Sequence, residues 1–212
     1  MILLTVSDVH ENTDVLRWLP QLAKDVDVVV VAGDVALWAK TEFYTQFYQT
    51  LSKSAKQILY VPGNHDPQIT LNLPNLTNLH AQEYELMGLK FAGMGGSNPT
   101  PFNTPLEYSD EEAEEMLSRL TGSIDIFVSH TPPYNTNCDR ADSDRHIGSI
   151  PIRRFVERVK PRLVLCGHAH ESRAIDRVGE AIVVNGGAAK YSYYTKIHYS
   201  HGEFQVELLE AR

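Results

Sequence analysis

The chain has 212 residues, of which 42% are hydrophobic, and this length and composition suit one α/β domain with a sizeable core. Its formal net charge of -8 disfavours a nucleic-acid polymer as a partner, because the polyanion would be repelled. Cys138 and Cys166 are too few for a disulfide scaffold and favour a reducing, cytoplasmic setting. The start of the chain lacks the basic region of a signal peptide, and no apolar run is long enough to cross a bilayer, so we expect neither leader nor membrane anchor.

The first third of the chain alternates strand and helix signals. Apolar runs predict β-strands at residues 2–6, 26–32 and 57–61. Amphipathic stripes predict one helix that begins near Asn12 or Thr13 and a second helix with Thr41 as its N-cap. Polar residues follow the three strands directly, in the order Asp8-Val-His10, Gly33-Asp34 and Gly63-Asn64-His65-Asp66.

The middle of the chain has a different pattern. Residues 76–93 predict short strands joined by a turn at residues 87–88. A helix is then predicted over residues 110–120, because apolar residues recur there at intervals of three and four. Ser109 and Glu112 form a capping box, which fixes the start of this helix.

The last third returns to alternation. Apolar runs predict strands at residues 124–128 and 163–166, separated by a helix that Pro161 terminates. Polar residues again follow the strands, as Ser129-His130 and as Gly167-His168-Ala-His170. Residues 172–209 predict further short strands, with a turn at residues 201–202.

The order of these elements predicts the fold. It favours an α/β fold in which two packed mixed β-sheets are flanked by helices, an αββα sandwich formed by a single domain over residues 1–212. Open α/β sheets place ligands at the carboxyl ends of their strands, where Asp, Asn and His recur in this chain. Carboxylate, carboxamide and imidazole groups together suit divalent metals. The sequence therefore predicts a two-metal hydrolase.

The ordered motifs DxH, GD, GNHD, SH and GHxH, which run from Asp8 to His170, resemble those of the calcineurin-like metallophosphoesterase superfamily. The stretch from Ser129-His-Thr-Pro-Pro through His146-Ile-Gly-Ser to Gly167-His-Ala-His-Glu is similar to the small, capless branch found in bacteria and archaea. The resemblance implies a metallophosphoesterase-like fold and a metal-dependent phosphoesterase that acts on a small organophosphate.

The same resemblance implies a site for two divalent metal ions, with Mn, Fe, Zn, Co and Ni all open as their identity. The family's ligands would place one metal on Asp8, His10 and His170 and the other on Asn64, His130 and His168, with Asp34 bridging them. The two ions would share a hydroxide nucleophile. His65 would donate a proton to the leaving oxygen or stabilise the developing charge.

Two positions depart from the family pattern. Many members carry an acidic residue three positions after the bridging Asp, where it orients the catalytic histidine. This chain has Leu37 there, so the usual orienting partner of His65 is missing. Glu11 follows the DxH motif where glycine is common, either as a partner of a ligand histidine or as an exposed loop residue.

Several residues near or outside the motifs receive structural interpretations. Asp66 is expected to brace its loop or cap a turn. Gly63 and Gly167 are expected to supply unusual backbone angles in tight turns. Three further histidines are expected on the surface or packed among strands, namely His80, His198 and His201.

Two long loops rich in Pro and Asn, residues 95–106 and 131–147, are expected to bound a shallow groove at the metals. The second loop carries candidate substrate-binding residues among acidic ones: Arg140, Arg145 and His146 among Asp139, Asp142 and Asp144. This loop is interpreted either as an exposed mixed-charge loop or as a rim of the site that determines specificity, in which one cationic side chain steers the substrate.

Three functions stay open at this point. The first is hydrolysis of a small phosphodiester or cyclic phosphate, and the second is a phosphomonoesterase or protein phosphatase. The third is a non-catalytic binding scaffold on the same fold, which the complete ligand set disfavours. A diester carries one negative charge on its phosphate against nearly two for a monoester, so the acidic chain favours diesters. The oligomeric state also stays open.

Overall fold

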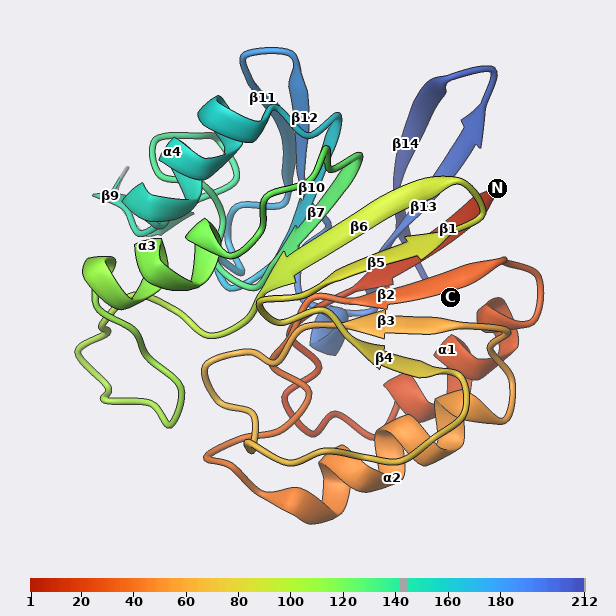
Figure 1. Cartoon of the computed structure of the whole chain (residues 1–212). Helices are drawn as coiled ribbons and strands as arrows, with labels where there is room; N and C mark the ends of the chain where they lie inside the picture. Colours follow the sequence, from red (N-terminus) through yellow and green to blue (C-terminus); the bar gives the residue numbers. More distant parts are fainter. Residues whose placement is uncertain (142–144, 212) are drawn as a thin grey trace.

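The computed structural model describes residues 1–141 and 145–211. Two six-stranded sheets pack face to face, and Figure 1 shows helices on the outer side of each sheet. The helices α1 (Val15–Ala23) and α2 (Thr41–Ser52) cover the first sheet, and α3 (Asp110–Ser118) and α4 (Ile150–Val159) lie against the second. The predicted αββα sandwich is therefore confirmed. Every helix of the described residues is too short or too polar to cross a bilayer.

The first sheet has the strand order β14-β13-β1-β2-β3-β4. Its strands are β1 (Ile2–Val6), β2 (Val28–Val31), β3 (Ile58–Tyr60), β4 (Leu76–Asn78), β13 (Tyr193–Ser200) and β14 (Glu203–Glu210). The strands β1 to β4 run parallel, and β13 pairs with β1 in the antiparallel direction. The parallel strands end side by side, which brings the residues that follow them to one edge of the sheet.

The second sheet has the order β11-β12-β10-β7-β6-β5. Its strands are β5 (Glu83–Leu86), β6 (Leu89–Met94), β7 (Ile126–Ser129), β10 (Leu163–Cys166), β11 (Ala174–Val178) and β12 (Ala181–Asn185). Its four central strands are parallel, and the two edge strands are antiparallel to their neighbours. The remaining elements are the short hairpin of β8 (Arg140–Ala141) and β9 (Arg145–His146) and the 3-10 turn η2 (Ala189–Tyr191).

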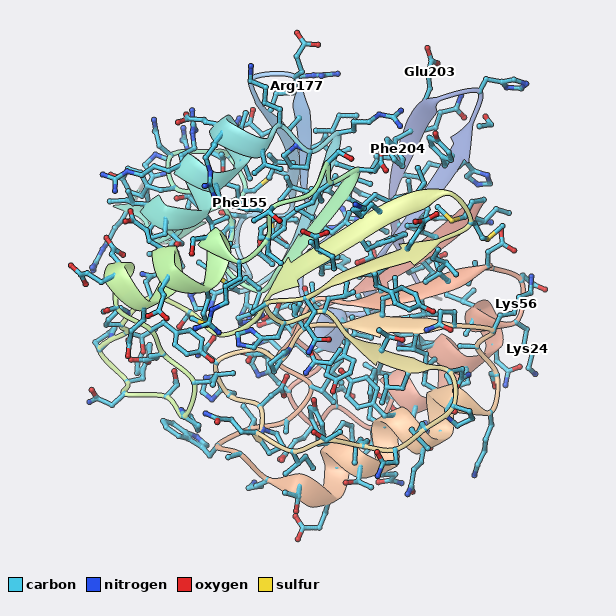
Figure 2. All side chains as sticks on the ribbon, viewed as in Figure 1. Lys24, Lys56, Phe155, Arg177, Glu203 and Phe204 are labelled. Atoms are coloured by element: carbon cyan, nitrogen blue, oxygen red, sulfur yellow. The ribbon has the colours of Figure 1, made fainter. Side chains whose placement is uncertain are left out.

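A layer of fully buried apolar side chains joins the two sheets and includes Leu3, Val30, Phe91, Val128 and Leu165 (the side chains are drawn in Figure 2). Two further clusters fill the spaces between each sheet and its helices. The central strands are buried on both faces, which explains why they appear in the sequence as continuous apolar runs.

Local sequence signals placed most element boundaries to within two or three residues. The capping box of Ser109 and Glu112 is present at the start of α3. Both predicted hairpin turns are also present, and at each of them two consecutive residues have positive φ, 53° and 77° in one and 50° and 81° in the other. The prediction of Thr41 as an N-cap is wrong. Thr41 is the first helical residue of α2, and the cap position belongs to Lys40, whose side chain makes no capping hydrogen bond.

Candidate metal centre

Five strand ends from both sheets meet at one place and bring the motif residues together. The loops after β1 and β2 are joined by hydrogen bonds from Asp8 N–H to the Gly33 carbonyl (2.9 Å) and from His10 N–H to the Asp34 carbonyl (3.0 Å). The two sheets are linked there as well, because the His168 N–H donates to Asp8 Oδ2 at 3.0 Å. We call these strand-end loops, residues 7–11, 32–39, 62–66, 129–130 and 167–171, the floor of the site.

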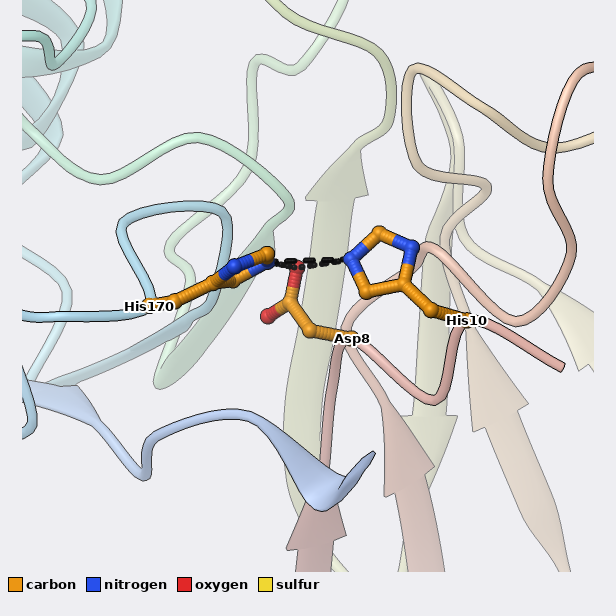
Figure 3. Close-up of side chains that lie close together, drawn as sticks. All are labelled: Asp8, His10 and His170. Carbon is orange, nitrogen blue, oxygen red and sulfur yellow. Dashed lines mark hydrogen bonds and ion pairs between the residues drawn. The ribbon is translucent and has the colours of Figure 1, made fainter. Parts of the chain in front are cut away.

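Asp8, His10 and His170 form the first group of donor atoms (Figure 3). The Nε2 atoms of His10 and His170 lie 3.0 Å apart, and His170 Nε2 is 3.2 Å from Asp8 Oδ1. Two imidazole nitrogens at this distance need a proton or a cation between them, because two lone pairs would repel. Asp8 is buried, so a carboxylate supplies the compensating charge. This arrangement fits a divalent metal.

Asn64, His130 and His168 form the second group. Asn64 Oδ1 lies 2.9 Å from His130 Nε2 and 3.1 Å from His168 Nδ1. Asp34 Oδ2 lies between the two groups, 3.5 Å from His130 Nε2 and 3.8 Å from His10 Nε2. The structure therefore brings together all seven residues for which the sequence predicted metal ligation, with Asp34 in a position to be shared.

Residues outside the motifs orient these donors. His130 Nδ1 donates to the Ala32 carbonyl at 2.7 Å, which turns Nε2 toward the site. The Asn64 amide donates to Thr104 Oγ1 at 2.9 Å, so Asn64 presents its oxygen. Lys190 Nζ lies 3.1 Å from His170 Nδ1. Sequence reasoning missed Thr104 and Lys190, because neither lies in a motif and only the fold brings them to the site.

Burial and neighbouring charges shift the pKa values of the candidate ligands, mostly toward the protonation states that bind a metal. Burial lowers the pKa of both His10 and His168 to about 4, so both rings are neutral at pH 7. Burial alone would raise the pKa of the Asp8 carboxyl, but the hydrogen bond and charge of His170 hold it below its usual range. His130 behaves differently, because the charge of Asp34 outweighs burial and raises its pKa to about 9. A positive charge is thus stabilised at His130, where a cation can replace the proton.

The backbone is strained at the candidate ligands. Asp8, His10, Asp34 and His168 have φ values of 57°, 47°, 55° and 67°, a left-handed region that non-glycine residues rarely adopt. Such strain concentrates at functional sites. The tight packing of the floor holds these residues in place.

The expectation that Gly63 and Gly167 supply unusual backbone angles is wrong, since neither has positive φ. Both glycines instead make room for carboxylates. A Cβ on Gly63 would lie 2.0 Å from Asp34 Oδ1, and one on Gly167 would lie 2.5 Å from Asp8 Oδ2. Close approach, and not turn geometry, is the reason for glycine at both positions.

His65 lies beside this centre and is held by its main chain and by neighbouring rings. Its N–H donates to Asp34 Oδ1 at 2.8 Å, and its carbonyl accepts from Ala39 N–H at 2.8 Å. The ring contacts Trp38 and His10 edge to face, at 5.1 and 5.7 Å between centroids. Its buried Nδ1 has no hydrogen-bond partner in residues 1–141 and 145–211. The missing acid at position 37 is therefore not replaced from elsewhere in the described chain.

Two acidic residues near the centre have structural contacts. The buried Asp66 accepts from Ala36 N–H and Gly63 N–H, both at 2.8 Å, and so braces two loops of the floor, as expected. Burial raises the pKa of Asp66 to about 7. The Glu11 side chain is 22% exposed and pairs with Lys40 at 3.2 Å, so Glu11 is a partly buried loop residue held by a surface lysine.

A cleft of about 680 Å³ lies over the centre. Its lining includes six of the motif residues, namely His10, Asp34, Asn64, His65, His168 and His170. Two loops form its walls, which we define as residues 95–106 and, within the described chain, residues 131–141 and 145–148. Arg145 and His146 line the cleft, whereas Arg140, on β8, is not among its lining residues. The predicted acidic neighbours Asp142 and Asp144 lie outside the described residues.

Comparisons with known proteins find a matching family model, related sequences and a related structure. A sequence model of calcineurin-like phosphoesterases matches residues 1–172. An uncharacterized protein of Methanocaldococcus jannaschii is 38% identical over 194 residues, which cover 86% of this chain and 88% of that protein. A Vesicomyosocius okutanii protein named "Probable cyclic nucleotide phosphodiesterase" is 22% identical over 196 residues, 86% of this chain and 82% of its own. A crystal structure from Thermus thermophilus matches over 97% of both chains, with a TM-score of 0.78 and 22% identity, which shows the same fold.

Proposed function

The chain belongs to the calcineurin-like phosphoesterase family and is a metal-dependent phosphoesterase, and from this premise we propose that it uses two metal ions to hydrolyse a small phosphodiester or cyclic phosphate. One observation carries the proposal: two groups of donor atoms converge under a single cleft, and Asp34 Oδ2 lies within 3.8 Å of an imidazole nitrogen of each group.

The residues present suit two divalent ions. We propose Asp8, His10 and His170 for one ion, Asn64, His130 and His168 for the other, and Asp34 for both. When bound, the ions supply Lewis acidity, which activates water and neutralises charge on the phosphoryl group. Mixed nitrogen and oxygen donors accept Mn, Fe, Co, Ni or Zn, so availability decides the metal.

The chain's own residues supply orientation and hydrogen bonds. His65 lines the cleft beside Asp34 and is placed to hydrogen-bond a phosphoryl or leaving oxygen. Arg145 is exposed on the second wall of the cleft, where its positive charge attracts an anionic ester. The cleft is open enough for a small organic group on the phosphate.

Charge favours a diester over a monoester. The chain carries a formal net charge of -8, and a diester brings one fewer negative charge to it than a monoester does. The resemblance to a relative named as a cyclic nucleotide phosphodiesterase supports the same choice.

The test is the ratio of kcat/KM for a nitrophenyl phosphodiester to kcat/KM for the matching monoester, measured with the same metal. We expect the diester to be preferred and metal analysis to find two ions per chain. A strong preference for the monoester would replace this proposal with a phosphomonoesterase. A folded, metal-loaded protein that hydrolyses no ester of a mono-, di- and cyclic phosphate panel would point to a binding scaffold.

A further inference from the structure

The second wall of the cleft holds an imidazole that is paired with a buried carboxylate. His146 lines the cleft and its side chain is 22% exposed, whereas the Asp139 side chain is fully buried. His146 Nδ1 lies 2.6 Å from Asp139 Oδ1. An ionised carboxylate can only accept, so Nδ1 carries the hydrogen, and Nε2 occupies the other edge of the ring. Nε2 has no hydrogen-bond partner within residues 1–141 and 145–211.

Asp139 is held in one orientation by the main chain of its own loop. Its carboxylate accepts from the N–H groups of Asn135 (3.0 Å), Thr136 (2.8 Å) and Gly148 (3.0 Å). A Cβ on Gly148 would lie 2.7 Å from Asp139 Oδ2, so the glycine permits this approach. The carboxylate is thus fixed before any substrate binds, and it fixes the ring of His146 in turn.

The wall is also tied to the floor. The buried Asn185 side chain donates to the Cys138 carbonyl at 3.1 Å and to the Ala169 carbonyl at 2.9 Å. Ala169 lies between the candidate ligands His168 and His170. The Ser172 hydroxyl adds a hydrogen bond to the Arg140 carbonyl. These contacts tie the segment that carries Asp139, the partner of His146, to the metal centre.

His65 and His146, which line the cleft but are not candidate metal ligands, differ in how their Nδ1 atoms are bonded. The Nδ1 of His65 is buried without a hydrogen-bond partner among the described residues, so no side chain orients that ring through Nδ1. The Nδ1 of His146 lies 2.6 Å from a buried carboxylate, which holds the ring in one orientation. A group that transfers a proton has to be held in this way, with its other nitrogen available to the substrate.

We propose that His146, positioned by Asp139, donates the proton to the leaving oxygen of the ester, while His65 stabilises charge on the phosphoryl group; this assignment rests on the proposed function of the cleft. The oxygen of the attacking water forms a new bond to phosphorus, and the P–O bond to the leaving group breaks. The electron pair of the broken bond stays on the departing oxygen, which takes the Nε2 proton. His146 is left as a neutral ring still bonded to Asp139. The attacking water releases one proton to solvent, and solvent returns one to His146, so the cycle consumes one water. The assignment specifies the substrate class as esters of weakly acidic alcohols, because the oxygen of such an alcohol is a poor leaving group until it is protonated.

The test compares methyl aryl phosphodiesters whose leaving phenols differ in acidity, using the metal-loaded full chain. His146→Ala is expected to lower kcat/KM by about 100-fold for phenol and less than about threefold for dinitrophenol, because a good leaving group needs no proton. Added imidazole should restore part of the lost activity for phenol. His65→Ala should lower kcat/KM about equally for both. An equal loss for both phenols in His146→Ala, or no rescue by imidazole, would overturn the assignment.

Two further variants and one binding measurement complete the test. His146→Gln keeps a hydrogen-bond donor but holds no transferable proton, so it should resemble His146→Ala on the phenol ester. Asp139→Asn should show the same leaving-group pattern, with thermal melting and metal content measured to detect loosening of the loop. Affinity for an inert methyl phosphonate ester is measured in parallel. If the wild type hydrolyses no ester, the proposed function fails, and the affinity for the phosphonate then tests the contact with His146 by itself. An approximately tenfold loss of affinity in His146→Ala supports this contact, and no loss overturns it.

Discussion

The floor and the walls of the cleft are fixed by different interactions. On the floor, candidate ligands follow directly from strand ends, and four of them have a left-handed backbone. Asp8 and Asp34 lie so close to Gly167 and Gly63 that a Cβ on either glycine would overlap a carboxylate. On the walls, the described residues 95–106, 131–141 and 145–148 are held by single side chains. Asn64 bonds to the Thr104 side chain, and Asp139 accepts from the Gly148 main chain. From this difference we expect most substitutions on the floor to impair folding or metal binding. Substitutions on a wall should leave the metals bound. Substitutions in the two regions should therefore differ greatly in effect.

Asp34→Ala should have the largest effect. Asp34 Oδ2 lies between the two donor groups, so its loss should abolish hydrolysis and weaken the binding of both metals. Metal content is measured by elemental analysis on folded protein, with circular dichroism as the control for folding. Two tightly retained metals in the variant would contradict a shared role for Asp34.

His65→Ala should affect turnover and leave the metals in place. The His65 side chain lines the cleft but completes neither donor group, so metal content should match the wild type. The expected loss in kcat is about 10²–10⁴-fold, the range for removal of a group that assists proton transfer or charge stabilisation. Loss of one metal in this variant would show instead that the ring supports the floor.

Gly63→Ala should disturb the floor without removing any polar group. The new Cβ would overlap Asp34 Oδ1, and overpacking of this kind costs about 1–3 kcal/mol. The free energy of unfolding is measured in urea, together with metal affinity. Gly122→Ala is the matched control, because its Cβ would meet only the ends of the flexible Glu83 and Lys90 side chains. Equal stability of the two variants would contradict the close-approach explanation.

Arg145→Ala should alter only substrate attraction at a wall. Arg145 is exposed, and an exposed charge contributes about 0.2–1 kcal/mol, which corresponds to an increase in KM of roughly 1.4- to fivefold. The effect should shrink at high salt, because the interaction is screened. Arg140→Ala, on the same hairpin but outside the cleft lining, is the control and should change KM less. A fall in metal content would show instead that Arg145 supports the metal centre.

His80 should make the first wall sensitive to pH, with the smallest effect of the five. Its Nδ1 accepts from Gly95 N–H at 2.9 Å, where this wall begins. Burial lowers the pKa of His80 in the folded chain, so the neutral ring stabilises the fold above the unfolded pKa of about 6.5, and this stability is lost as pH falls through the folded pKa. The urea midpoint of the wild type should therefore drop more from pH 7 to pH 5 than that of His80→Gln. Equal drops would contradict a neutral, bonded His80.

The sequence predicted what depends on neighbours in the chain. The capping box of Ser109 and Glu112 is local, and so are the apolar runs that end at the five polar motifs. Because parallel strands end at one edge, placing the motifs after strands was enough to predict that their donors converge. The family resemblance added the assignment of individual residues to individual metals.

The tertiary structure decided what depends on distant parts of the chain. Gly63 has to be glycine because Asp34 lies against it, and no local turn pattern contains that fact. The structure alone joins the Asp139–His146 pair to the metal centre, through Asn185 and Ala169, which are 16 residues apart in the chain. Hydrophobic periodicity and capping reveal which residues form an element, since they act over a few residues. The distances between side chains of different elements follow from the packing of the two sheets, and that packing is what set the geometry of this site.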